Sequence, residues 1–175
     1  MTHAIRGRGR AVAVAVLALS ALSAAPTAAA TFTHRTIVTI DHTRVPDADL
    51  LPLANFPVLV SLTHDNLKTT GNGGFVTSSQ GHDILFQGED APTCGGASPC
   101  RLDHEIESYD GTTGTIVAWV RVPGTIFDAS DGSNTPIYMY YGNPAVTCSQ
   151  ENKTGVWDAS DREAVHVKAD GVQTD

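Results

Sequence analysis

Three short runs of β-favouring residues between Leu102 and Pro144 constrain the fold more than any other feature of this chain. The runs lie at residues 102–109, 115–122 and 137–141, and turn residues close each of them. This arrangement predicts an antiparallel meander. Short strands spaced by turns recur along the rest of the chain, with no heptad pattern, long amphipathic helix or internal repeat. The sequence therefore predicts an all-β fold, an antiparallel β-sandwich of jelly-roll-like type.

Further strands are expected at residues 36–41, 56–62 and 83–86. Within 56–62, Phe56, Val58, Val60 and Leu62 alternate with Leu59 and Ser61, so one face of that strand is apolar. Residues 65–68 are expected to form a single helical turn, capped by Thr63 or Asp65.

The first thirty residues have the order of regions typical of a secretory signal peptide. Three arginines at positions 6, 8 and 10 precede an apolar run at 11–22, and Ala28–Ala30 offers a small-residue cleavage site. The apolar run is too short to span a bilayer. The predicted organisation is a cleaved signal peptide at 1–30, a β-sandwich domain at 31–158 and a poorly ordered polar tail at 159–175. The mature chain is expected to be soluble and extracytoplasmic, with no membrane span.

The charge balance narrows the classes of partner. The chain has 11 basic and 19 acidic residues, a formal net charge of −8. Losing a leader that carries three of the basic residues and no acidic one leaves −11. So acidic a surface argues against nucleic acid and anionic membranes, which attract clustered Lys and Arg.

The three cysteines suggest one disulfide. Cys94 and Cys100 bracket Gly-Gly-Ala-Ser-Pro, a flexible turn that lets the two sulfur atoms meet. A metal site is disfavoured, because the spacing is not Cys-x-x-Cys and no second ligand pair follows. Cys148 is left over, either as a buried thiol or as an exposed reactive one.

Pairing of residues 102–109 with 115–122 predicts a charged face. The register that keeps apolar residues together sets four pairs opposite each other: Leu102 and Val122, His104 and Val120, Ile106 and Ala118, Ser108 and Ile116. The other face then sets Asp103 across from Arg121, Glu105 across from Trp119, and Glu107 across from Val117. The candidate ligand-binding residues are Asp103, Glu105, Glu107, Trp119 and Arg121.

This face has two interpretations. An indole can stack on the apolar face of a sugar ring while carboxylates accept hydrogen bonds from its hydroxyl groups. The alternative is an ordinary half-covered face of the sandwich, in which Asp103 and Arg121 form a weak cross-strand ion pair. Antiparallel sheets commonly have one solvated charged face.

Other chemistry has little support in the sequence. His104 shares a face with apolar residues, which indicates a satisfied core histidine rather than a base or ligand. Calcium could in principle bind the three alternating carboxylates, or Asp128, Asp131 and Asn134, but that loop lacks EF-hand spacing. No serine-nucleophile motif occurs. Glu105 and Glu107 would lie about 7 Å apart on one strand, near the inverting-glycosidase range, yet nothing indicates a cleft. We expect no enzyme activity, no cofactor and no metal.

The chain also resembles a bacterial family called domain of unknown function 2341. The resemblance covers about residues 32–158 and lies in eight motifs: Thr-Ile-Asp-His-Thr (39–43), Asn-Phe-Pro-Val-Leu-Val-Ser-Leu (55–62), Gly-His-Asp-Ile-Leu-Phe (81–86), Leu-Asp-His-Glu-Ile-Glu (102–107), Ala-Trp-Val-Arg-Val-Pro (118–123), Tyr-Tyr-Gly-Asn-Pro (140–144), Ser-Gln-Glu-Asn (149–152) and Val-Trp-Asp (156–158). It implies an extracytoplasmic β-sandwich module, often placed before a concanavalin-like lectin domain or beside envelope proton-channel components. The family has no established catalytic residues, so the resemblance assigns none here.

Two functional hypotheses follow. The leading one is a secreted, non-catalytic binding or accessory module for cell-surface or environmental polysaccharide, based on the Glu105–Trp119 face and on the lectin-adjacent family context. The alternative is a structural spacer or protein-interaction domain of the cell envelope with no small ligand. A largely buried Trp119 covered by neighbouring chain would favour the alternative, whereas an open groove lined by aromatic residues would favour the glycan.

Overall fold

The computed structural model describes residues 32–41, 53–127, 133–157, 166–167 and 173–174. The predicted signal peptide lies outside the described residues, as does most of the predicted tail. Asp128 and Asp131 of the second calcium alternative also lie outside them. Within the described ranges, no helix has the length and apolar character that a membrane crossing requires.

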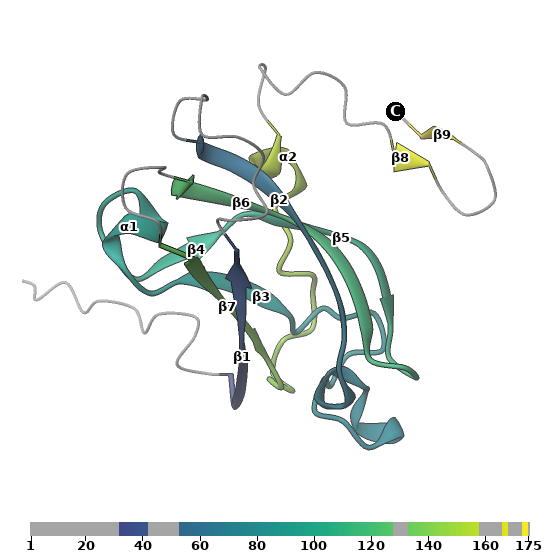
Figure 1. Cartoon of the computed structure of the whole chain (residues 1–175). Helices are drawn as coiled ribbons and strands as arrows, with labels where there is room; N and C mark the ends of the chain where they lie inside the picture. The colour runs from purple at the N-terminus through teal and green to yellow at the C-terminus, as the bar shows by residue number, and fades with distance from the viewer. Residues whose placement is uncertain (1–31, 42–52, 128–132, 158–165, 168–172, 175) are drawn as a thin grey trace, which may run out of the picture.

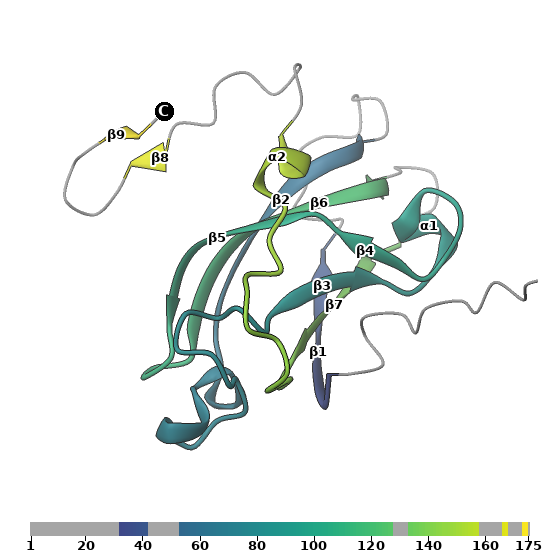
Figure 2. The same ribbon diagram turned by 180° about the vertical axis from the view of Figure 1, so that it is seen from behind.

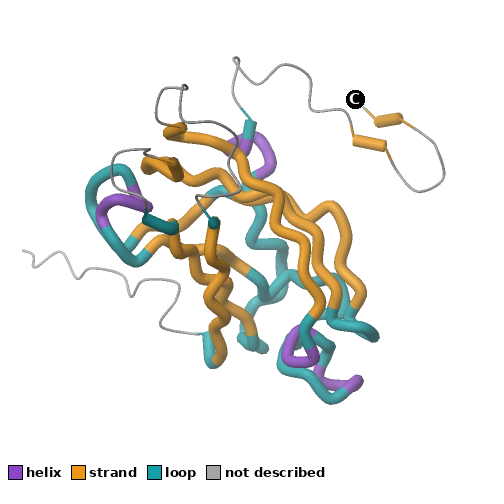
Figure 3. Tube along the Cα trace, in the orientation of Figure 1, coloured by secondary structure: helices purple, strands orange, loops and turns teal. Residues whose placement is uncertain are grey.

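Two antiparallel sheets pack face to face, as Figures 1 and 3 show. The four-stranded sheet has the order β1-β7-β3-β4 and the three-stranded sheet the order β2-β6-β5. The strands are β1 (His34–Ile40), β2 (Leu53–Thr63), β3 (Leu85–Gly88), β4 (Cys100–Leu102), β5 (His104–Asp110), β6 (Thr115–Phe127) and β7 (Thr135–Tyr141). The predicted antiparallel sandwich is confirmed; these sheets hold seven strands, where a full jelly roll has eight.

Short helical elements fill the connections. They are η3 (Asp65–Leu67), η4 (Thr70–Asn72), α1 (Ala91–Cys94) and α2 (Lys153–Val156), and the short strands β8 (His166–Val167) and β9 (Gln173–Thr174) pair only with each other. The predicted turn at 65–68 is confirmed as η3, but its cap is His64, whose Nδ1 accepts from the Asn66 N–H at 3.1 Å.

The core lies between the sheets. Both contribute buried apolar side chains, among them Phe86, Leu102 and Met139 from one sheet and Ile116, Val120 and Val122 from the other. The predicted alternation of β2 is confirmed over residues 58–62, where Val60 is buried and Leu59 is exposed, but Phe56, which was expected on the apolar face, is 42% exposed. Gly124 lets α1 approach β6, because a Cβ there would lie 1.6 Å from the Pro92 carbonyl oxygen. Larger residues are therefore excluded at position 124.

The predicted meander is wrong in its third strand. β5 and β6 form the expected hairpin, but β7 lies in the other sheet, between β1 and β3. Alternate residues of β7 are buried, which is the pattern that its sequence shows. Period-two alternation indicates which face of a strand is buried, but it does not indicate which strands lie beside it. The residues of β7 therefore could not predict the sheet to which it belongs.

The predicted register of the hairpin is correct at one end only. His104 pairs with Val120, Glu105 with Trp119 and Ile106 with Ala118, as expected. A β-bulge between Ile106 and Ser108 then shifts the pairing. Ser108 consequently meets Val117 instead of Ile116, and Glu107 is the extra residue of the bulge. Bulges are common at sheet edges, and β5 is an edge strand.

The predicted strand 102–109 is in fact two strands in different sheets. Leu102 belongs to β4 and pairs with Phe86 rather than with Val122. Asp103 is the point at which the chain changes sheet, and its carbonyl oxygen accepts from the Arg121 N–H at 2.8 Å. A strand that passes between sheets forms a closed corner of the sandwich.

His104 lies in the core at this corner, as predicted, but only one of its two ring nitrogens has a hydrogen-bond partner within the described structure. Its Nδ1 lies 3.3 Å from the Leu102 carbonyl oxygen, and its ring meets Phe86 edge to face at 5.3 Å. Its Nε2 has no hydrogen-bond partner within the described structure. Burial lowers the pKa of His104, since removal from water disfavours the charged ring.

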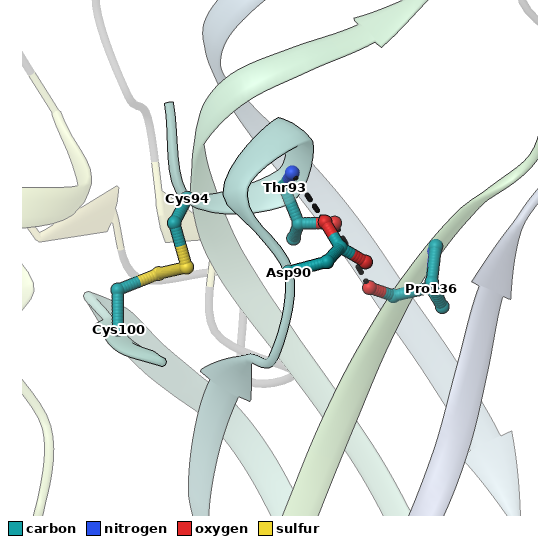
Figure 4. Close-up of a disulfide and its surroundings, with 5 residues drawn as sticks. All are labelled: Asp90, Thr93, Cys94, Cys100 and Pro136. Atoms are coloured by element: carbon teal, nitrogen blue, oxygen red, sulfur yellow. Dashed lines mark hydrogen bonds between the residues drawn. A yellow bond between two sulfur atoms is a disulfide. The ribbon is translucent and has the colours of Figure 1, made fainter. Parts of the chain in front are cut away.

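The predicted disulfide between Cys94 and Cys100 is present. It joins the end of α1 to the start of β4 with a Cα–Cα distance of 5.8 Å (Figure 4). Asp90 caps α1 by accepting from the Thr93 N–H at 2.7 Å, and the Thr93 hydroxyl donates to the Pro136 carbonyl at 3.3 Å (Figure 4). The bridge therefore ties a loop that is anchored on β7 to the edge strand β4. Cys148 is outside the bridge and exposed.

Candidate functional site

The predicted charged face is the outer surface of β5 and β6, and residues 149–157 lie against it. We call these residues the strap. In Figure 2 the strap follows the end of β7 and leads into α2 beside β5 and β6. It contains no alternating apolar pattern, and its only regular element is the single turn of α2.

The strap completes the free edge of β5. The Asn152 N–H donates to the His104 carbonyl at 3.1 Å, and the Ile106 N–H donates to Glu151 Oε1 at 2.7 Å. Backbone groups of an edge strand need such partners or water. The strap therefore takes the place of a further strand on this side of the sheet.

Each candidate on the strap side of the face is held by the strap. Asp103 Oδ1 accepts from Asn152 Nδ2 at 2.9 Å. Glu105 is buried, and its Oε2 accepts from Trp157 Nε1 at 3.0 Å. Arg121 is also buried, and it donates through Nη1 to the Val156 carbonyl and through Nε to Asn55 Oδ1 at 2.9 Å.

Close packing holds α2 against this corner. A Cβ added to Gly155 would lie 2.4 Å from Asp103 Oδ2 and 2.5 Å from Asn152 Nδ2. The Asp103 and Asn152 side chains are hydrogen-bonded to each other, so neither can move aside without breaking that hydrogen bond. Glycine is thus the residue that lets α2 reach Asp103.

Two indoles meet over the middle of the face. Trp119 of β6 and Trp157 of the strap pack edge to face, with ring centroids 5.1 Å apart and an interplanar angle of 64°. Such pairs add about 1 kcal/mol beyond the burial of their area. Trp119 Nε1 donates to Glu107 Oε1 at 3.0 Å. Both indoles are half-buried, and Glu107 remains exposed at the margin.

Charges within the strap are arranged to hold it. Lys153 Nζ lies 3.3 Å from Glu105 Oε1 and 3.5 Å from Glu151 Oε1. Burial alone would raise the pKa of Glu151, but hydrogen bonds from the Ser149 hydroxyl and the Ile106 N–H outweigh it and lower the pKa. Burial likewise opposes the charge of Lys153, yet Glu151 and Glu105 raise its pKa. Both groups therefore stay charged at neutral pH.

The structure brings together four of the five predicted residues and leaves one at the edge. Asp103, Glu105, Trp119 and Arg121 all lie against the strap or its indole, whereas Glu107 stands at the bulge. Sequence reasoning missed the strap residues as part of this face: Glu151, Asn152, Lys153, Gly155 and Trp157. The only sequence signal was that most of them belong to two of the motifs that carry the family resemblance.

A second set of motif residues surrounds Asp83. This buried carboxylate accepts five hydrogen bonds of 2.7 to 3.3 Å, from the backbone and hydroxyl of Thr77 and from the N–H groups of Ser78, Gly142 and Asn143. It joins the loop before β3 to the end of β7. The motifs at 81–86 and 140–144 therefore meet in a structural contact.

Metal-binding geometry does not occur in the part of the chain that the structure describes, where no three His, Cys, Asp or Glu side chains gather as ligands. The carboxylates of Asp103, Glu105 and Glu107 accept hydrogen bonds from protein donors instead. Their arrangement serves to attach one segment of chain to another.

Comparison with known protein families yields a match. The model of a family described as Domain of unknown function (DUF2341) matches residues 81–168. The match begins before β3 and runs through the strap to β8, while β1 and β2 precede it. No curated protein and no solved structure matches the chain.

Proposed function

The chain belongs to the family described as Domain of unknown function (DUF2341), and on that premise we propose that it is a non-catalytic structural or protein-interaction module of the cell envelope or extracellular space. The proposal is supported above all by the strap, which occupies the face where a small ligand would otherwise bind. Hydrogen bonds from the strap already satisfy the Asp103 and Glu105 carboxylates, and Arg121 donates to its backbone.

The location outside the cytoplasm is supported by two features. The Cys94–Cys100 disulfide is typical of proteins from oxidising compartments, and the first thirty residues have the pattern of a secretory leader. Cell fractionation tests this part directly. Expressed in a bacterium with a C-terminal tag, the protein should accumulate outside the cytoplasm and begin at Thr31. Retention of the uncleaved chain in the cytoplasm would overturn it.

Glycan binding is a second candidate, and it is supported by the margin of the face. The exposed Glu107 carboxylate and the half-buried Trp119 indole, bonded to each other at 3.0 Å, could contact a sugar from the side that the strap leaves accessible. This candidate retains only two of the five residues that the sequence suggested.

Affinity electrophoresis in gels containing soluble polysaccharides separates the two candidates. The structural module should migrate like a non-binding reference protein in every gel. Retardation that is lost in Trp119→Ala, but kept in the Ser79→Lys surface control, would favour the glycan-binding module and reject the first proposal. Thermal melts of both variants verify that they are folded.

A further inference from the structure

The side of the sandwich away from the strap has two free strand edges. β1 is the last strand of one sheet and β2 is the last strand of the other, and neither has a second neighbour among the described strands. Residues 37–40 of β1 and 58–62 of β2 together line a groove of about 350 Å³. Each edge therefore has backbone groups that no described strand pairs, and both edges open toward the same groove.

The groove is uncharged and apolar. None of its nine lining residues is ionisable, although the chain as a whole carries a net charge of −8. Ile37 is 57% exposed and Leu59 is 50% exposed. Val38, Ile40, Val58 and Leu62 pack against the core but are themselves only partly buried. An added layer of chain would cover apolar surface here without burying a charge.

Within the described residues, the parts of these two edges that line the groove have none of the devices that prevent strand addition. Natural sheets protect an edge with a bulge, a proline, a lysine or a covering segment. β2 has its irregular register and Pro57 before Val58, so the lining part of the strand is regular. β1 contains no proline or lysine, and its pairing with β7 is regular from His34 to Ile40. These edges can accept another strand.

The chemistry that the groove requires of such a strand is present in β1 itself. The strand must be extended and uncharged where it meets the groove, and residues 36–40 of β1 satisfy both conditions. A two-fold axis at Ile37 would pair all seven residues of β1 with those of a second copy, setting Arg35 opposite Thr39 so that no like charges meet. Elsewhere the acidic surfaces of two copies repel each other, which favours contact at this neutral groove.

We propose that the β1–β2 groove is the interface of a symmetric dimer, in which β1 of one copy pairs antiparallel with β1 of the other and joins their sheets. The same rotation turns the Val58–Leu62 edge toward the second copy, so that two grooves cover each other. The dimer goes beyond the module function proposed above and uses a different surface, so either proposal can fail without the other.

Sedimentation of the secreted chain from micromolar to millimolar concentration tests the dimer. Cys148→Ser serves as the background for all variants, because that exposed thiol could cross-link copies on its own. The background protein should show a concentration-dependent shift to twice the monomer mass. Ile37→Lys should weaken association by about tenfold, because it sets two like charges directly opposite each other in the paired strands. Leu59→Lys should also weaken it, because it adds a positive charge to each of the two β2 edges that face each other. Ser79→Lys adds the same charge at an exposed site outside the groove and should leave association unchanged.

Cysteine cross-linking tests the pairing itself. With the axis at Ile37, this residue lies directly opposite its own copy, and the Cα atoms of such a pair are about 5 Å apart, a distance suited to a disulfide. Ile37→Cys should therefore give a covalent dimer on mild oxidation. Thr39→Cys is on the same face of the same strand, but its copies would lie about 13 Å apart and should not cross-link.

Three results would overturn the dimer. The first is a monomer at every concentration, which is also the result expected if another segment of the same chain fills the groove. The second is a dimer that survives both lysine substitutions. The third is cross-linking through position 39 in preference to position 37. Because Ile37 and Leu59 are half exposed, the lysine variants should keep the melting temperature of the monomer, which a melt at low concentration verifies.

Discussion

The two sides of this sandwich differ in how their edge strands are covered. One side has the edge strands β4 and β5, and the other has β1 and β2. On the strapped side β4 has only three residues and is tied by a disulfide, while β5 carries a bulge and is covered by residues 149–157. On the open side, β1 and residues 58–62 of β2 present regular edges around an apolar groove. A sheet edge must be paired, covered or protected against pairing with another chain. The strapped side meets this requirement within one chain, whereas the open side is suited to pairing with a second chain.

The difference also separates stability from interaction. Buried charged side chains such as Glu105 and Arg121 lie on the strapped side. Removing a hydrogen-bond partner there would leave a buried charged group without that bond. Exposed apolar side chains, such as Ile37 and Leu59, lie on the open side. Substitutions on the strapped side should therefore affect the folding of the monomer, and substitutions on the open side should affect its association.

The largest effect is expected for Trp157→Ala. The variant loses the edge-to-face contact with Trp119 and leaves Glu105 Oε2 without its indole donor. Loss of a large, partly buried aromatic with its hydrogen bond should cost about 3 kcal/mol, and differential scanning calorimetry should show a melting temperature lower by roughly 10 °C. A change within error would mean that the strap does not stabilise this side.

The next effect is expected from removing the disulfide. Replacing both Cys94 and Cys100 with serine releases the α1 loop from β4 and should lower the free energy of unfolding by about 2 kcal/mol, as a short closed loop allows. Urea denaturation measures it. Cys148→Ser is the matched control and should leave the midpoint unchanged, since that thiol is exposed. Equal effects of the two changes would show that the bridge does not stabilise the strapped edge.

A smaller and pH-dependent effect is expected for Glu151→Gln. The folded state lowers the pKa of Glu151 below its ordinary value of 4.5, so its contribution is complete above that pH and is lost as pH falls through the lowered pKa. The variant should be about 1 kcal/mol less stable than wild type at pH 7, and this gap should narrow as the pH is lowered through the acid range. Urea titrations at neutral and acid pH provide the comparison; a gap independent of pH would exclude the carboxylate as the cause.

On the open side, Leu59→Ser should change the stability of the monomer by less than about 0.5 kcal/mol, as is usual for exposed positions. Its side chain is half exposed. Melting at low protein concentration tests this value. A loss as large as that of Trp157→Ala would show that the groove is part of the closed core, and would remove the contrast between the two sides.

The smallest effect is expected from deleting the residues after Asp158. That segment is polar and charged in sequence, so we expect it to bury too little apolar surface to offset about 1–2 kcal/mol of backbone entropy per ordered residue. The melting temperature should stay nearly unchanged, in contrast to Trp157→Ala. A deletion more damaging than Trp157→Ala would place the stabilising end of the strapped side beyond residue 158.

Local patterns in the sequence determined the class of fold and several of its contacts. Period-two alternation identified the buried face of β2, because side chains of a strand point alternately to its two sides. The six-residue separation of Cys94 and Cys100, with two glycines between them, was enough to pair them. The hydrophobic pattern also set Glu105 opposite Trp119, since a slip by one residue would have exposed the apolar face.

Only the tertiary structure decided which edges are covered. The strap has no periodicity, and its attachment depends on hydrogen bonds from Asn152 and Trp157 to side chains some fifty positions earlier in the chain. The placement of β7 beside β1, and the change of sheet at Asp103, are likewise choices between neighbours distant in sequence. Such choices follow from how two whole layers pack together, and no local segment contains the information. The Asp103 and Glu105 carboxylates, which in the sequence resembled a ligand site, accept hydrogen bonds from the strap in the tertiary structure.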